Sequence, residues 1–146
     1  DFQPFHFIPK GSLSVVRERL EHVIDKLIIH LSANLKIELK MPYGETRYLH
    51  PMTIYYVGSS ANYIEFHLEN GETVKIRGKL DEMMDKFNPY LFARIHKRFV
   101  VNMKFIRRVD FPNSRLIMYD ETYLGISRAY KSKFEDAYNI YLRSFE

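Results

Sequence analysis

The stretch LFARIHKRFVVN, residues 91–102, interleaves basic with apolar side chains. Its basic members are Arg94, Lys97 and Arg98, and its apolar members include Phe92, Ile95, Phe99, Val100 and Val101. An alternating segment of this kind can bury one face in a core and offer the other, cationic face to a polyanion. It also fits a solvated basic strand that has no partner. By itself, the stretch leaves both interpretations open.

The net charge of the 146-residue chain, +4, comes from the surroundings of this stretch. Residues 91–110 contain six Lys or Arg and one Asp, whereas residues 1–90 contain 11 basic and 12 acidic residues. Residues 111–146 contain five of each sign. Positive charge concentrated in one segment favours a nucleic acid as the partner.

Short alternating segments on both sides of the stretch predict a mainly β fold. Apolar and polar residues alternate over residues 35–40 and 64–68. The pair Asn70-Gly71 predicts a tight hairpin because it tolerates positive φ. Further strands are expected at 54–57, 74–76, 99–101, 107–111, 116–119 and 123–126. Strands at this spacing, separated by turns, indicate small antiparallel sheets.

An amphipathic helix is predicted over residues 13–31, with Ser12 or Ser14 as its N-cap. Its apolar residues recur at steps of three and four: Leu13, Val16, Leu20, Val23, Leu27 and Leu31. Because this spacing is close to a heptad, the helix either packs on another part of a protein or pairs with a copy of itself. The helical period stops at 32–34, which divides the chain into residues 1–32 and 33–146. A short helix over 80–87 and a closing helix over 128–145, with Ser127 as N-cap, complete the prediction.

The motifs of common enzymatic chemistries are missing from the sequence. The chain has no Cys, which excludes thiolate metal sites, disulfides and Cys nucleophiles. It has no glycine-rich phosphate loop and no Gly-x-Ser-x-Gly elbow, and its six His are far apart. We therefore expect no enzyme, no metal and no cofactor. No stretch approaches the ~18–20 apolar residues that span a bilayer, and the first residues lack a signal-peptide pattern. We therefore expect the chain to be an excised piece of a soluble, cytoplasmic protein that has no membrane partner.

Residues 91–102 resemble the signature of the LytTR family of bacterial DNA-binding domains. The family run is Phe-x-Arg-x-His-(Arg/Lys)-Ser-(Phe/Tyr)-(Ile/Val)-Val-Asn followed by an Ile, for which Ile106 fits. Gly125-Ile126-Ser127-Arg128 matches the short strand and the Ser-Arg pair that open the family's closing helix. The preceding elements also follow the family's order: Ile54-Tyr55-Tyr56, the loop 58–62, the strand 63–68, Asn70-Gly71 and the helix 80–87. The resemblance covers residues 35–145.

What this resemblance implies is a transcription regulator, usually the output half of a response regulator in a two-component system. The implied LytTR-like fold is an elongated arrangement of small antiparallel sheets with short helices, preceded here by the amphipathic helix. Double-stranded DNA would be read by loops, often at paired direct repeats, with a homodimer on the DNA as one arrangement.

Three places in this sequence correspond to family loops that meet DNA. They are the loop 59–62 with Asn62, the turn with His96, Lys97 and Arg98, and the helix start at Ser127-Arg128 with Lys131. An Asn amide can read a base edge or bind phosphate. A Lys offers a point charge, and an Arg offers a planar fork. The family more often has Ser where Arg98 stands, so Arg98 either adds a contact or shifts the preferred sequence.

Structural roles for these residues stay open beside the functional ones. Asn62 could simply tolerate its turn, and Arg128 could form a surface salt bridge. Within the motif, Arg94 could pair with a carboxylate, and Asn102 could cap the turn that follows it. The DNA hypothesis requires Asn62, Lys97 and Arg128 to share one edge of the molecule, and their dispersal over opposite sides would refute it.

The first residues resemble the end of a receiver domain. Residues 5–10 and the helix that follows correspond to its last strand, its lysine and its last helix. Lys10 would match the lysine that senses the phosphoryl group, although receivers place Pro where Gly11 stands. This resemblance implies an upstream phosphoacceptor Asp on which a histidine kinase acts.

Two rival functions remain at this point. One is a protein-interaction module that uses the basic face and the helix 13–31. The other is RNA binding, which is disfavoured because the aromatic residues occupy alternating core positions and not an exposed stacking platform.

Overall fold

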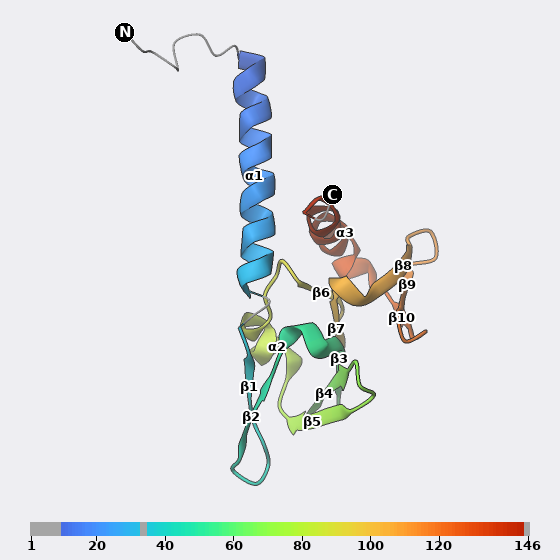
Figure 1. The fold of residues 1–146 in the computed structure, drawn as a ribbon. Helices are drawn as coiled ribbons and strands as arrows, with labels where there is room; N and C mark the ends of the chain where they lie inside the picture. The colour runs from blue at the N-terminus through green and yellow to red at the C-terminus, as the bar shows by residue number, and fades with distance from the viewer. Residues whose placement is uncertain (1–9, 33–34, 145–146) are drawn as a thin grey trace.

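The computed structural model of the protein describes residues 10–32 and 35–144. Its first element, α1 (Lys10–Ser32), is a long helix that projects from the rest of the molecule (Figure 1). The predicted N-terminal helix is thus confirmed. It begins at Lys10, so Ser12 and Ser14 lie inside the helix and neither is its N-cap. The receiver-like strand that the resemblance implies within residues 5–10 falls, apart from Lys10, outside the described residues.

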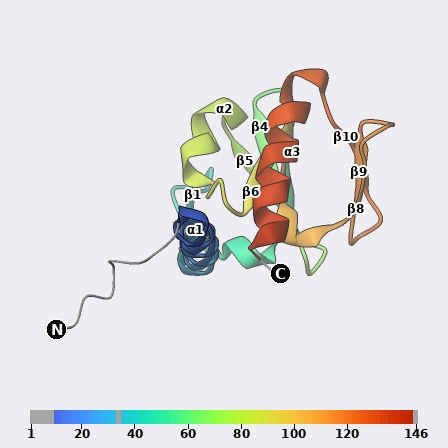
Figure 2. The ribbon, with the colours of Figure 1, turned by 90° about the horizontal axis from the view of Figure 1, so that it is seen from above.

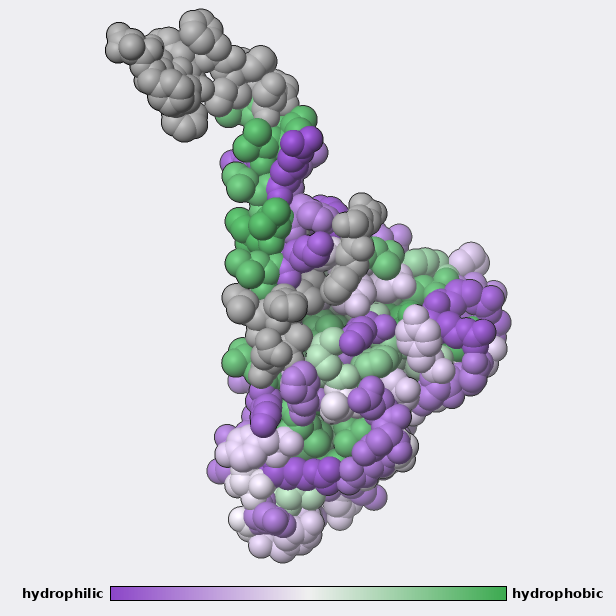
Figure 3. Space-filling view, in the orientation of Figure 1, coloured by the Kyte–Doolittle hydropathy of each residue, from purple (hydrophilic) through white to green (hydrophobic). Residues whose placement is uncertain are grey.

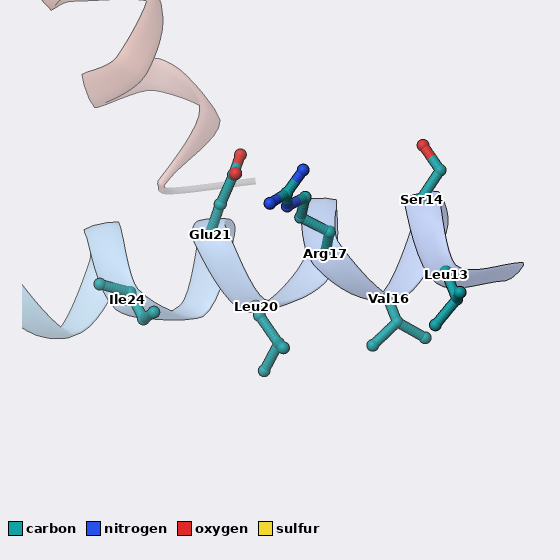
Figure 4. Close-up of a pocket in the computed structure, with 7 residues that line it drawn as sticks. All are labelled: Leu13, Ser14, Val16, Arg17, Leu20, Glu21 and Ile24. Carbon is teal, nitrogen blue, oxygen red and sulfur yellow. The ribbon is translucent and has the colours of Figure 1, made fainter. Parts of the chain in front are cut away.

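One side of α1 is apolar and exposed. The side chains of Leu13, Val16, Leu20, Val23 and Leu27 are 48–58% exposed, and they form a band along one side of the helix (Figure 3). In the close-up, Leu13, Val16 and Leu20 point away from Ser14, Arg17 and Glu21 (Figure 4). Burying a Leu or Val side chain stabilises a protein by about 1.5–3 kcal/mol. This face is therefore suited to packing, yet it meets no apolar partner in residues 10–32 and 35–144.

Five antiparallel strands form the central sheet in the order β5-β4-β3-β7-β6. They are β3 (Ile54–Ser60), β4 (Tyr63–Leu68), β5 (Thr73–Arg77), β6 (Phe92–His96) and β7 (Phe99–Asn102). The alternation predicted for residues 64–68 is observed, with Ile64 and Phe66 fully buried on one face. The Phe66 ring centre lies 6.2 Å from that of Phe87, so the segment after the short helix covers this face.

Two smaller antiparallel sheets flank the central one. They are formed by β1 (Ile37–Lys40) with β2 (Thr46–Leu49), and by β10-β9-β8, whose strands are β8 (Ile106–Asp110), β9 (Arg115–Met118) and β10 (Tyr123–Gly125). The expected architecture of small antiparallel sheets is confirmed. The sequence pattern did not identify β2 or β6 as strands, because only one residue of β2 is buried and the first two residues of β6 are both buried.

Short helices connect the strands, and a longer one closes the domain. They are the 3-10 helix η1 (Pro51–Thr53), α2 (Leu80–Met83) with η2 (Met84–Lys86), η3 (Met103–Phe105) and α3 (Arg128–Arg143). α3 packs along β6, and the sheet β8-β9-β10 lies to its side (Figure 2). Phe134, 1% exposed, anchors α3 in the core. Ser127 occupies the predicted N-cap position, but its hydroxyl makes no capping hydrogen bond.

The side chain of Asn102 fixes the end of the central sheet where β7 stops. It is fully buried, and its Oδ1 accepts a hydrogen bond from the amide of Lys104 at 3.0 Å. Its Nδ2 donates to the carbonyls of Pro51 (3.1 Å) and Ile54 (3.0 Å). The expectation that Asn102 caps the following turn is confirmed, and the same amide also holds η1 in place.

Candidate nucleic-acid interface

Strand direction brings separate loops to one end of the central sheet. β3, β5 and β6 finish at this end, and β4 and β7 begin there, because all five strands pair antiparallel. The β3–β4 turn, the β6–β7 turn and the residues after β5 are therefore neighbours. We call this end, made of residues 59–62, 77–79, 96–98 and 127–128, the cationic end.

Backbone hydrogen bonds hold these loops together. The amide of Ser59 donates to the carbonyl of Arg98 at 2.9 Å, which joins the β3–β4 hairpin to the β6–β7 turn. The amide of Gly78 donates to the carbonyl of Asn62 at 2.8 Å, which adds the residues after β5. Because these bonds are between main-chain groups, they leave the side chains of the turns available.

The start of α3 is tied to the same end. The amide of Ser127 donates to the carbonyl of Ile95 at 2.8 Å, and α2 and the first turn of α3 lie at one end of the domain (Figure 2). The structure therefore gathers Asn62, Lys97 and Arg128 together. This is the arrangement that the DNA hypothesis requires, and their contact with DNA stays a prediction.

The side chain of Arg94 organises the β6–β7 turn. Its Nε donates to the carbonyl of His96 (3.2 Å), and its Nη2 donates to the carbonyl of Lys97 (2.6 Å). It also forms the expected ion pair with a carboxylate, that of Asp81, and its guanidinium lies 5.3 Å from the ring centre of Tyr130. With 13% of its side chain exposed, Arg94 is a positioning residue and not a free surface cation.

His96 also shapes this turn. Its Nδ1 accepts a hydrogen bond from the amide of Arg98 at 3.1 Å, and its half-buried ring lies 5.8 Å from that of Phe99. In the neutral ring this leaves the proton on Nε2, which is then available as a donor. His96 is thus brought to the cationic end with one nitrogen committed to the backbone.

The turn conformation does not account for Asn62. The left-handed residue of the β3–β4 turn is Ala61, with φ 54°, whereas Asn62 is not among the described residues with positive φ. The side chain of Asn62 is exposed and has no hydrogen bond to another described residue. The amide is therefore free to read a ligand.

Three predicted cations at this end are unpaired. Lys97, Arg98 and Arg128 are exposed, and within residues 10–32 and 35–144 none of their side chains has a hydrogen bond or an ion pair. The surface salt bridge considered for Arg128 does not form in this part of the chain. Unpaired cations at one end are an electrostatic footprint for a polyanion.

Lys131 differs from the other predicted contact residues. Its Nζ donates to the carbonyl of Phe111 (2.8 Å) and to the Oγ of Ser114 (3.0 Å), and the side chain is partly buried. These bonds fasten α3 to the turn between β8 and β9. These bonds give Lys131 a structural role, and its predicted contact with DNA stays a prediction.

Two cations at this end were missed by the sequence prediction. Arg77 pairs in register with Tyr63, directly after Asn62, and Lys79 follows Gly78, whose φ is 156°. Both side chains are exposed and unpaired among the described residues. The signal for Arg77 was present in the alternation of β5, where Val74 and Ile76 are buried and Arg77 faces outward.

Titratable groups elsewhere on the sheet have packing roles. The ring of Tyr56 stacks on that of His67, with centres 4.3 Å apart. Burial raises the pKa of Tyr56 and lowers the pKa of His67, so both rings favour their neutral forms. No group of three His, Cys, Asp or Glu that could hold a metal ion occurs among the described residues. Of the helices in these ranges, none is long and apolar enough to cross a membrane.

A β-rich domain that presents unpaired cations from several turns at one end has an arrangement suited to binding a polyanion. Comparison with known families narrows the class of protein. The model of the family described as the LytTr DNA-binding domain matches residues 44–139, nearly two thirds of the chain, and the chain belongs to this family. LytTR is a family of DNA-binding domains, so double-stranded DNA is the partner class that the family implies.

A solved structure is similar over most of the domain. It is the LytTr DNA-binding domain of a putative methyl-accepting/DNA response regulator from Bacillus cereus, with a TM-score of 0.59. The sequence identity is 21%, and the match covers 70% of this chain and 94% of that chain. This likeness shows that the chain has the LytTR fold. No curated protein matches the chain.

Proposed function

We propose that this chain binds double-stranded DNA sequence-specifically through its cationic end, as the output domain of a two-component transcription regulator. One observation carries the proposal: separate loops bring Asn62, Lys97, Arg98 and Arg128 to one end with exposed side chains that have no partner in the described residues. Phosphates and base edges of a duplex offer the acceptors that these donors lack.

Arg128 and Asn62 are the side chains suited to reading bases. A guanidinium can donate two hydrogen bonds to O6 and N7 of guanine, and an Asn amide can pair with N6 and N7 of adenine. Both residues extend from backbone that is fixed by hydrogen bonds to neighbouring strands, through Ser127 and Gly78. A fixed backbone limits the conformational entropy lost on binding.

Lys97 is suited to a phosphate contact. Its ammonium is a point charge without directional preference, at an exposed turn. The start of α3, a helix of 16 residues, adds the positive end of a helix dipole at Arg128. Arg98 and the Nε2 of His96 complete the set, and their targets are a base or a phosphate within reach of the same turn.

The paired direct repeats implied by the resemblance predict two copies on one duplex. Each copy would then present its cationic end to a separate repeat. Titration of the chain against a duplex with one or two repeats, followed by native mass measurement, should give one and two bound copies respectively. A single copy on the two-repeat duplex at saturation contradicts this arrangement.

Residues 1–32 fit the end of a receiver domain in a cytoplasmic regulator. The exposed apolar face of α1 supports this, because the last helix of such a domain packs on a core. A histidine kinase would then act on a phosphoacceptor upstream of Lys10. The same exposed face of α1 also favours the rival function, a protein-interaction module. The two functions can be told apart because a protein-interaction module would not bind DNA.

Selection of bound sequences from a random duplex pool tests the proposal. The enriched duplex and a scrambled one are then titrated by fluorescence anisotropy at several salt concentrations. We expect tighter binding of the enriched duplex and a steep fall of both affinities with salt. No enrichment, or binding that does not change with duplex sequence or salt, refutes sequence-specific DNA binding and leaves the protein-interaction module.

A further inference from the structure

An open hollow with polar and apolar walls lies within the cationic end. Its volume is about 440 Å³, and it opens between the β3–β4 turn, the β6–β7 turn and the start of α2. Its polar wall is formed by Ser59, Lys79, Asp81, Arg94, Lys97 and Arg98. The three segments that surround it are far apart in sequence and meet through the backbone bonds of Ser59 and Gly78.

The charge of this hollow is strongly positive. Lys79, Lys97 and Arg98 line it without a side-chain hydrogen bond or ion pair in the described ranges. Among the described residues that line the hollow, Asp81 is the only acidic one, and it already forms an ion pair with Arg94. The three remaining cations repel one another, so an anion in the hollow would relieve that repulsion.

The remaining hydrogen bonds of Arg94 keep the hollow open. Its guanidinium donates to the carbonyls of His96 and Lys97, which directs these carbonyls toward Arg94. With the amide of Arg98 bonded to Nδ1 of His96, the turn has a fixed backbone. The side chains of Lys97 and Arg98 therefore start from a defined position on the wall.

We propose that this hollow holds a backbone phosphate of duplex DNA and that Lys79 is the third cation that binds it. The inference rests on the proposed function and adds a site between the loops, with a contact residue that the family resemblance did not supply. A phosphate suits the hollow better than a base, because its lysines are point charges and its walls come from turns on several sides. Lys79 thus fixes the position of the chain on the duplex and carries no base preference.

Salt-dependent titration of Lys79→Ala tests the inference. Losing one phosphate contact should reduce the slope of log K against log salt by about 0.9, which is an eightfold loss at 0.1 M salt if the affinities converge at 1 M. The loss should be the same on the enriched and the scrambled duplex, and Lys79→Arg should retain most of the affinity. Lys40→Ala, which removes an exposed cation from the separate sheet β1-β2, is the matched control and should leave the slope unchanged.

A second measurement locates the phosphate. Enriched duplexes that each carry one neutral methylphosphonate are titrated with the wild-type chain and with Lys79→Ala. At one position the neutral linkage should weaken the wild-type chain more than the variant, because the variant has already lost the Lys79 contact and keeps only those of Lys97 and Arg98. Thermal unfolding confirms that both Lys variants are folded.

The outcomes separate the two proposals. If the wild-type chain binds with a steep salt slope and Lys79→Ala behaves like Lys40→Ala, the phosphate site is wrong and DNA binding stands. A loss confined to the enriched duplex also overturns the phosphate assignment, because it makes Lys79 a base reader. If the wild-type chain ignores duplex DNA, the proposed function fails and this inference fails with it.

Discussion

Replacing Asn102 by Ala should destabilise the domain severely. The substitution removes three hydrogen bonds and leaves the amide of Lys104 and the carbonyls of Pro51 and Ile54 without that partner in a fully buried place. An unsatisfied buried polar group costs about 1–3 kcal/mol. Allowing for relaxation, we expect a loss of about 3–5 kcal/mol in the free energy of unfolding, a large part of the about 5–15 kcal/mol of a typical domain.

Urea denaturation followed by circular dichroism measures this loss. The matched control is Asn113→Ala, which also removes an Asn amide, but at an exposed turn where it donates to Asp110 at 2.8 Å. The control should lose less than about 1 kcal/mol, because exposed groups are rehydrated. Asn102→Asp keeps the acceptor for Lys104 but replaces the donor with a second acceptor facing two carbonyls, so it should be as damaging as Asn102→Ala. Equal, small losses for Asn102→Ala and the control would refute the reasoning.

Four further outcomes are expected. Arg128→Ala should cost about 1–3 kcal/mol of binding free energy on the enriched duplex and relax the sequence preference, whereas Lys97→Ala should weaken binding to all duplexes alike and reduce the salt slope by about 1. If Arg128→Ala loses the same affinity on enriched and random duplex, its base-reading role is contradicted. Arg94→Ala should lower both the thermal midpoint and the affinity for every duplex, since the β6–β7 turn loses its donors; a variant unchanged in both excludes a positioning role. Because burial lowers the pKa of His67, the free energy of unfolding should fall as pH drops below about 6.5, where the unfolded chain gains the proton first. His67→Gln should flatten this fall, and an unaltered pH slope in the variant speaks against it. A chain of residues 35–146 should keep the thermal midpoint and duplex affinity of the longer chain, and a large loss of either would show that α1 supports the domain.

The sequence predicted the fold where side chains alternate and failed where they do not. The strand at 64–68 and the hairpin at Asn70-Gly71 were readable, because each follows local rules: one face of β4 is buried, and Gly71 has φ 88°. β6 was missed because Phe92 and Ala93 are both buried and the register shifts between Arg94 and His96. Tertiary packing, not local pattern, sets the burial of such a strand.

The family resemblance predicted which residues belong to the candidate interface. The partners of their side chains and backbone could not be predicted, because these contacts join residues far apart in the sequence. Nothing local shows that Lys131 will donate to Phe111, 20 positions away, or that the residues after β5 will meet the β3–β4 turn. The pairing of Arg94 with a carboxylate and the cap formed by Asn102 were foreseeable as residue chemistry. Their partners Asp81 and Pro51 were not, because the fold alone brings them close.

Because the free side chains lie at turn tips, the residues proposed to contact DNA are different from the residues that hold the fold together. The side chains of Asn62, Lys97 and Arg128 have no hydrogen bond or ion pair with other described residues, whereas Arg94 and Asn102 hold the nearby backbone. Under the proposed function, replacing Asn62 or Arg128 should therefore change which nucleotides are preferred, at little cost in folding. If the tips do read DNA, descendants of such a domain could come to bind new operators by changing tip residues one at a time, while the buried anchors stay the same.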